Sequence, residues 1–273
     1  MLSRLYDLLT RPTEVVEVEG LLPFDGAIWP IVVVNVFFVV FAFRLGPWLM
    51  RNREPFNLKR VIMVYNIFQI IYNGIMAVLA IKLLSHYLEQ PDGLACIRPM
   101  SMDHPAKKFE IFCVLLYIGN KFSDYLETLF FILRKSYKQV TVLHVYHHIM
   151  MTSFLYLHMV TRGIGGQGST IGMLNTFVHV VMYVYYLLSS INTELKKSLW
   201  WKKYITQLQL AQFAIDFVHQ LWPLVMVPDC PVSTVWQCFA LTQAVVMMWM
   251  FGNFYHKTYI RKPKDKQLTG KQS

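Results

Sequence analysis

The stretch that decides the fold class lies near the N-terminus. Residues 27–48 read AIWPIVVVNVFFVVFAFRLGPW, and Arg44 is their one charged residue. A helix that crosses a membrane needs about 20 mostly apolar residues, and this stretch satisfies that requirement. The sequence therefore predicts a membrane protein with a helix over residues 27–48.

The overall composition supports the same class. The chain has 273 residues, of which 55% are hydrophobic and only 15% are charged, whereas soluble chains carry about 25% charged residues. Lys and Arg nevertheless exceed Asp and Glu, which gives a net charge of +10. This combination excludes disorder, a coiled coil and a nucleic-acid-binding tail, and it indicates a membrane protein with basic loops.

Six further apolar stretches follow the first one. They cover residues 61–84, 109–133, 140–160, 169–190, 204–227 and 233–255. We therefore predict an all-α membrane protein with seven transmembrane helices over residues 27–255, preceded by a segment over residues 1–26 and followed by a basic tail over residues 256–273. Residues 1–26 contain five acidic side chains and no long apolar core, which argues against a cleavable signal peptide.

The distribution of basic residues predicts the orientation. Most of the 26 Lys and Arg residues fall in the loops 51–60, 134–138 and 196–203 and in the tail. In a seven-helix arrangement these segments share one side of the membrane. Basic loops face the cytosol, so we expect a cytosolic C-terminus and a lumenal N-terminus.

Two cysteines occupy the opposite side. Cys96 and Cys230 lie in two different loops that this topology places in the lumen, where oxidising conditions allow disulfides. We predict a disulfide between them, and two free thiols are the alternative.

Polar residues inside the predicted helices carry the functional information, because an ionisable group in a membrane helix is costly. Lys121, Asp124 and Glu127 stand three residues apart and share one helical face. Two acids and one base leave a surplus acid, which needs a partner from another helix or a proton. The group is either a structural ion pair or the polar wall of a cavity.

The next predicted helix begins with the sequence HVYHH. His144 stands one turn from both His147 and His148. Such a cluster fits metal binding, because imidazole suits Fe, Zn and Cu. It also fits acid–base or nucleophilic chemistry by a histidine with a near-neutral pKa.

Two more stripes of polar and aromatic residues follow at helical spacing. The first comprises Asn175, His179, Met182, Tyr183 and Tyr186, and the second comprises Thr206, Gln209, Gln212 and Asp216. The helical rise of about 1.5 Å per residue places these groups, the histidines and Glu127 at one level in the cytosolic half of the membrane. The sequence thus predicts a pocket with a polar cytosolic mouth and an apolar interior, which suits an acyl-CoA.

Several motifs together resemble the very-long-chain fatty acid elongase family. They are LGP (45–47), NKFSDYLETLFFILRK (120–135), HVYHH (144–148), NTFVHVVMYVYY (175–186), TQLQLAQF (206–213) and NFYHKTY (253–259). The family's third-helix motif reads Lys-x-x-Glu-x-x-Asp-Thr, whereas this chain exchanges the two acids as Asp124 and Glu127.

The resemblance implies the condensation of an acyl-CoA with malonyl-CoA in the endoplasmic reticulum membrane. It also implies that six of the seven helices form a barrel around a closed-ended acyl tunnel. We expect His147 to form an acyl-imidazole, with His144 and His148 orienting or deprotonating it, and Asn175 and His179 stabilising the oxyanion. We expect the substrate to contact Lys121, Asp124, Glu127, Tyr183, Tyr186, Gln209, Gln212, Lys202 and Lys203.

Beyond its substrates and membrane lipid, the protein is expected to need no metal or cofactor and to bind no nucleic acid. Other enzymes of the elongation cycle and a second copy of the chain are further candidate partners.

Three rival functions remain open at this point. A di-iron desaturase or hydroxylase also uses HxxHH, but such enzymes need about eight histidines in several boxes, and this chain has one box. A seven-helix receptor would place its ligand pocket on the outer side. A transporter would need a pathway to both faces, often with broken helices.

Overall fold

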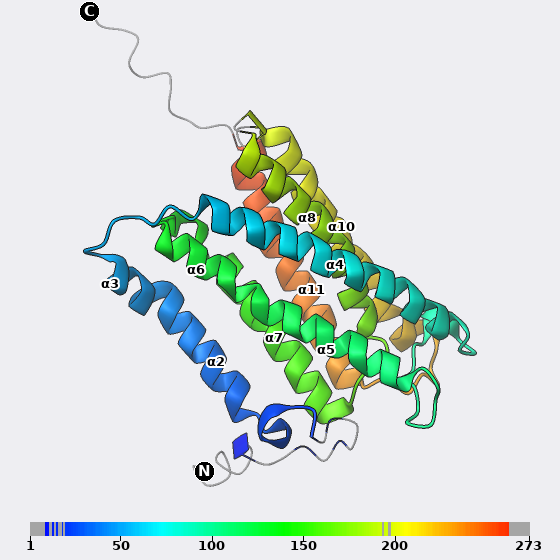
Figure 1. Cartoon of the computed structure of the whole chain (residues 1–273). Helices are drawn as coiled ribbons and strands as arrows, with labels where there is room; N and C mark the ends of the chain where they lie inside the picture. The colour runs from blue at the N-terminus through cyan, green and yellow to red at the C-terminus, as the bar shows by residue number, and fades with distance from the viewer. Residues whose placement is uncertain are drawn as a thin grey trace, which may run out of the picture.

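The computed structural model of the chain describes residues 9–10, 13, 15, 18, 20–192, 194–195 and 198–261 (Figure 1). Most of the predicted N-terminal segment, the tail after residue 261, Lys196 and Lys197 lie outside these described residues. Within the described part every regular element is a helix, and the predicted all-α class is confirmed.

Helices cover all seven predicted stretches. The principal elements are α2 (Trp29–Val40), η3 (Phe41–Leu45), α3 (Gly46–Met50), α4 (Lys59–Leu88), α5 (Lys107–Ser123), α6 (Tyr125–Leu133), α7 (Val142–Arg162), α8 (Ser169–Ile191), α10 (Leu199–Met226), α11 (Thr234–Tyr255) and η6 (His256–Ile260). Short turns over Pro23–Gly26, Gly93–Ala95 and Tyr137–Gln139 (η2, η4 and η5) complete the described elements.

Within the described residues, four helical segments are long and apolar enough to cross a membrane on their own. They are Trp29–Met50, Lys59–Leu88, Ser169–Ile191 and Thr234–Ile260. The segments α5–α6, α7 and α10 are less apolar because they carry the charged, histidine and glutamine residues noted above. The chain is therefore a multi-pass helical membrane protein, and the count of seven crossings stays a prediction.

The helices pack against one another in a defined order (Figure 1). Helix α4 contacts α5 and α8, α7 contacts α5 and α11, and α10 contacts α8 and α11. Helix α2 packs against α7, and α3 packs against α6. This order brings α6, α7, α8 and α10, which carry most of the predicted catalytic and substrate-binding residues, around a common interior.

The first predicted helix is interrupted at its LGP motif. Residues Phe41–Leu45 form a π-helical turn directly before Gly46 and Pro47. Proline lacks the N–H that an α-helix would use, so the regular hydrogen-bond ladder is interrupted at Pro47. A Cβ atom at Gly46 would lie only 2.9 Å from side-chain carbons of Ile132, so glycine allows α3 to approach α6.

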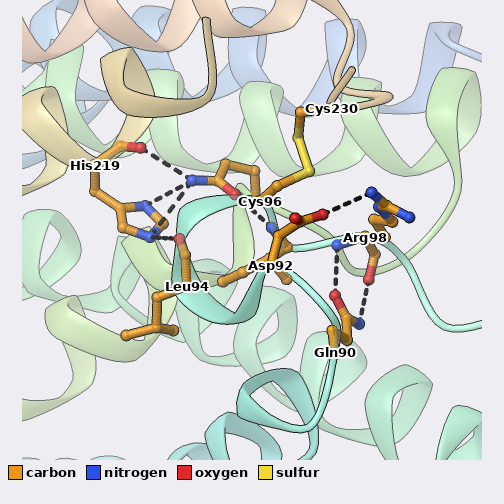
Figure 2. The surroundings of a disulfide bond; sticks show 9 residues. Gln90, Asp92, Leu94, Cys96, Arg98, His219 and Cys230 are labelled. Carbon is orange, nitrogen blue, oxygen red and sulfur yellow. Dashed lines mark hydrogen bonds and ion pairs between the residues drawn. A yellow bond between two sulfur atoms is a disulfide. The ribbon is translucent and has the colours of Figure 1, made fainter. Parts of the chain in front are cut away.

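One end of the bundle, hereafter the disulfide end, carries the loops 89–106, 163–168 and 227–233. Cys96 and Cys230 are joined there in a disulfide with a Cα–Cα distance of 5.8 Å, the pairing that the sequence predicts (Figure 2). The Gln90 amide exchanges two 2.9 Å hydrogen bonds with the backbone of Arg98, and Arg98 pairs with Asp92 at 2.6 Å. These contacts order the loop that holds Cys96.

A buried ion pair lies behind the same end. Lys107 Nζ is 2.8 Å from Glu110 Oε2, and both side chains are almost fully buried. Lys107 also donates to the carbonyl oxygen of Ile164, and Tyr87 donates to Glu110 Oε1 over 2.6 Å. Gly165 has φ +100°, and a Cβ there would lie 1.9 Å from Glu110. Glycine is therefore the only residue that position 165 accepts where the loop 163–168 packs against this ion pair.

Candidate active site

A cavity of about 440 Å³, hereafter the histidine cavity, opens among α6, η5, α7, α8, α10, α11 and η6. Its wall contains all five predicted catalytic residues, which are His144, His147, His148, Asn175 and His179. Among the predicted substrate contacts, Glu127, Tyr183, Tyr186, Gln209, Gln212 and Lys202 also line it. The structure thus gathers residues from four segments of the sequence around one space.

The start of α7 positions the three neighbouring histidines. Thr141 caps the helix by accepting a 3.1 Å hydrogen bond from the backbone N–H of His144, as expected for an N-cap threonine. His144 Nε2 forms a 2.8 Å hydrogen bond with Thr128 Oγ1 of α6, and its ring lies 4.4 Å from that of His148. His144 and His148 are therefore held by the helix that carries the acidic residues.

Glu127 is the surplus acid that the sequence indicates. Its Oε1 accepts a 2.7 Å hydrogen bond from the Tyr183 hydroxyl, and its Oε2 lies 3.7 Å from His148 Nε2. The acid is thus partnered by a tyrosine and a histidine of two other helices, as a group of this kind requires.

Lys121 and Asp124 lie behind the cavity wall. Their side chains are both 2% exposed and form a 2.9 Å ion pair, and neither belongs to the described residues that line the histidine cavity. Asp124 Oδ1 also accepts 3.0 Å hydrogen bonds from Tyr183 and from Gln69. The structure therefore places these two charges one layer outside the residues that face the cavity.

This layer fixes the orientation of Asn175. Its Oδ1 accepts hydrogen bonds from Lys121 Nζ over 2.9 Å and from the Tyr117 hydroxyl over 3.0 Å. Because the oxygen and nitrogen of an amide point in different directions, the NH₂ group is turned away from these partners. Asn175 lines the cavity beside His147, where an NH₂ group is a hydrogen-bond donor for a developing negative charge.

The basic residues divide into those on the wall and those outside it. Lys202 lines the histidine cavity together with Lys138, which the sequence analysis did not single out. Lys203 is exposed and is not among the described residues of this wall.

Sequence reasoning also missed Gln69 and Tyr117. Gln69 binds Tyr65, Ser123, Asp124, Asn73 and Asn120 and is fully buried. Its recurrence with Asn66 and Asn73 at helical spacing in an otherwise apolar stretch is the signal that could have identified it. No comparable pattern marks Tyr117, because its role depends on which helix faces it.

Two smaller cavities lie in sequence beside the first. The central cavity, of about 50 Å³, shares His147, Asn175, Gln212 and Phe213 with the histidine cavity. The apolar cavity, of about 80 Å³, shares Phe154 with the central one and ends at Ile164, Gly165 and Ser169. The series therefore runs from the histidines to the disulfide end, where the Lys107–Glu110 ion pair lies.

Glu127, His144 and His148 deserve comparison with a metal site. They bring one ligand atom each within 4.8 Å of one another. Two ligands of one zinc ion, each at about 2.1 Å, lie at most about 4.2 Å apart, and the 3.7 Å between Glu127 Oε2 and His148 Nε2 is within that limit. His144 Nε2 already bonds Thr128. These three residues are the ones that could hold an ion, and catalysis without a metal remains a prediction.

The family is decided by comparison with known proteins. The model of the ELO (GNS1/SUR4) family matches residues 23–267, which is most of the chain. The chain belongs to the GNS1/SUR4 family. The family match spans every cavity described above.

Named relatives extend this assignment. The chain is 44% identical to very long chain fatty acid elongase F of Drosophila simulans, over 86% of this chain and 88% of the relative. It is 43% identical to the protein of the same name in Drosophila melanogaster, over 83% and 87% of the two chains. It is also 34% identical to human very long chain fatty acid elongase 4, over 87% of this chain and 74% of the human protein.

Proposed function

We propose that the chain is a fatty acid elongase that condenses an acyl-CoA with malonyl-CoA. The products are a 3-oxoacyl-CoA lengthened by two carbons, CO₂ and free CoA. Membership of the GNS1/SUR4 family and relatives named very long chain fatty acid elongases support this activity. The single observation that carries it is the grouping of His147, Asn175 and His179 on one cavity, with the central and apolar cavities beside it.

The proposed architecture is a barrel of six membrane-spanning helices with the α2–α3 segment outside it. The contacts of α4, α5, α7, α11, α10 and α8 support it, because each of these helices touches the next and the last touches the first. We place the protein in the endoplasmic reticulum membrane, with the disulfide end in the oxidising lumen and the basic loops in the cytosol.

The three cavities define the proposed substrate path. The CoA moiety occupies the mouth of the histidine cavity, where Lys138 and Lys202 can contact its phosphates. The acyl chain extends through the central cavity into the apolar cavity. The path supports a substrate with a charged head and a long apolar tail, and membrane lipid surrounds the outer faces.

The proposed first step acylates His147. An imidazole nitrogen attacks the thioester carbonyl carbon, the C–N bond forms and the C–S bond breaks. The proton lost by the imidazole passes to the leaving thiolate, so free CoA departs as the thiol. His144 and His148 orient the nucleophile. Lys121 and Asp124 act indirectly, because they hydrogen-bond Asn175 and Tyr183, respectively.

The second step transfers the acyl group to carbon. Malonyl-CoA loses CO₂, and the carbanion at its C2 attacks the acyl-imidazole carbonyl. The C–N bond then breaks, and the released imidazole takes up a proton. The NH₂ group of Asn175, with His179, stabilises the negative charge on oxygen in both steps, and such donors can each contribute about 3–4 kcal/mol.

The test uses the full-length protein purified in detergent. Labelled malonyl-CoA and a panel of acyl-CoAs should give products two carbons longer, with equal yield in the presence of a metal chelator. Acyl-CoA alone should release CoA and leave an acyl group on a peptide that contains His147. No elongated product from any acyl-CoA would refute the function. Release of CoA by His147→Ala without malonyl-CoA would refute the nucleophile alone.

Interactions with other enzymes of the elongation cycle and with a second copy of the chain are also proposed. Co-purification from native membranes and the mass of the detergent-solubilised particle would test them.

A further inference from the structure

A buried acid in α10 has no place in the mechanism described so far. Asp216 is 4% exposed and sits within a predicted membrane-spanning stretch. Its Oδ2 accepts a 3.3 Å hydrogen bond from Gln212 Nε2, and its Oδ1 has no hydrogen-bond partner. Among the described residues Asp216 forms no ion pair. A buried polar atom without a partner costs stability, so such a residue in a membrane helix calls for a functional reason.

The location of Asp216 points to that reason. Asp216 and Gln212 both line the central cavity, together with His147 and Asn175. Gln212 also lines the histidine cavity. The Gln212 side chain therefore stands at the junction of two cavities beside the proposed nucleophile, and among the described residues its hydrogen-bond partner is Asp216.

The chemistry of the pair fixes the orientation of the amide. An unprotonated carboxyl oxygen accepts hydrogen bonds and cannot donate them, so it selects the NH₂ end of Gln212. The amide oxygen Oε1 is then turned away from Asp216. An apolar residue at position 216 would leave the amide free to rotate.

An oriented acceptor matters for a histidine nucleophile. While one ring nitrogen attacks, the other carries a proton, and the hydrogen bond made by that proton selects the tautomer. His147 Nδ1 is buried and has no hydrogen-bond partner among the described residues. Catalytic hydrogen bonds often tighten only when the substrate is bound.

We propose that Asp216 is a positioning residue that holds the Gln212 amide with its oxygen toward His147, so that Gln212 accepts the imidazole N–H during acylation. The proposal rests on the proposed elongase function. Asp216 lines the central cavity on the proposed acyl path, but the proposal assigns it no contact with the reacting atoms and no proton transfer of its own.

Two variants test it in the purified full-length protein. Asp216→Leu removes the acceptor, and Asp216→Asn keeps the shape but can hold the amide in either orientation. The readouts are the single-turnover release of CoA from acyl-CoA, its dependence on acyl-CoA concentration, and the melting temperature. Asp229→Asn, which removes an exposed carboxylate in the loop after α10, is the matched control.

We expect Asp216→Leu to slow CoA release roughly 10- to 100-fold, the range typical of a displaced catalytic group. Asp216→Asn should slow it less, the KM for acyl-CoA should change little in both, and the melting temperature should stay equal or rise. An unchanged rate in Asp216→Asn and Asp216→Leu would overturn the proposal. So would a lower melting temperature in both variants, which would assign Asp216 to folding.

If Asp216→Leu does not fold, Asp216→Asn alone decides, and a wild-type rate in it overturns the proposal. Wild-type protein that elongates no acyl-CoA would refute the proposed function instead, so the two failures are distinguishable.

Discussion

The ammonium group of Lys121 donates a 2.9 Å hydrogen bond to Asn175 Oδ1, although the two residues lie on different helices. This contact joins the buried charge layer of α5–α6 to the wall of the histidine cavity. Lys121 does not line the histidine cavity, but it controls the orientation of the Asn175 amide, which does.

Replacing Lys121 should therefore affect both stability and activity. Lys121→Met leaves Asp124 buried without its cation, which should cost about 3–5 kcal/mol of unfolding free energy, and it frees the Asn175 amide. The double variant Lys121→Met/Asp124→Asn removes both charges, so thermal scans should show a recovered melting temperature while the elongation rate stays low. Recovery of both quantities would contradict the role in orienting Asn175.

The donor itself can be removed while the acceptor that Lys121 and Tyr117 bind is kept. Asn175→Asp keeps the oxygen that Lys121 and Tyr117 bind but replaces the NH₂ group with a second oxygen. Loss of one oxyanion donor typically lowers the rate by about 10²–10³-fold. Elongation assays should show that loss at a melting temperature no lower than that of the wild type, and a rate within twofold would argue against an oxyanion role.

The lysines at the mouth should act on substrate affinity. Lys138→Gln and Lys202→Gln each remove a charge from the cavity wall, so the KM for acyl-CoA should rise while kcat is retained. Surface charge contacts are screened by salt, so the difference from wild type should shrink at high ionic strength. Lys59→Gln, at an exposed position at the start of α4, serves as the control, and an equal rise in its KM would point to a general effect of charge.

Gly168 offers a way to shorten the apolar cavity. It lines that cavity, its backbone is in the ordinary right-handed region, and a Cβ there would meet no atom within 4 Å. Gly168→Leu should therefore fill the space with little strain and reduce the length of the longest product. Chromatography of the products checks this, and Gly74→Leu, at another open position outside the three cavities, should leave product lengths unchanged. An unaltered product range in Gly168→Leu would exclude the apolar cavity as the acyl site.

The disulfide should contribute to stability. It closes a loop with a sequence separation of 134 residues, and such bonds typically stabilise by about 2–4 kcal/mol. The double variant Cys96→Ser/Cys230→Ser should thus unfold at a lower temperature in a thermal scan. Cys238→Ser, at a free exposed cysteine, should match the wild type, and equal melting temperatures for all three proteins would contradict the prediction.

The sequence predicted the positions of the helices well, because runs of apolar residues and turn signals are local properties. The α7 prediction, for example, began two residues early and ended two residues early relative to Val142–Arg162. Periodicity also identified the polar faces that carry His147, Asn175 and Gln212. It did not show which faces meet. The substrate contacts of Lys121 and Asp124 stay predictions, and in the structure these two residues lie behind Asn175 and Tyr183.

Residues that act through long-range contacts left little signal. No sequence pattern marks Tyr117 or Lys138. They contribute to the site only because α8 and α10 pack nearby, where Tyr117 binds Asn175 and Lys138 lines the histidine cavity. The close approach of Gly46 to Ile132, next to the π turn, is likewise a contact between separate helices. Both features depend on tertiary packing, which a single sequence does not contain.

The contacts that hold the loops at the disulfide end bear on the order in which substrates bind and products leave. The loop 163–168 is held there by the buried Lys107–Glu110 pair, and the neighbouring loops are joined covalently. We therefore expect substrates to enter and leave through the histidine cavity. Two CoA groups would then compete for one entrance, so the first must depart before malonyl-CoA arrives. Free CoA should accordingly inhibit in competition with malonyl-CoA, and the lengthened acyl chain must withdraw along the route by which it came.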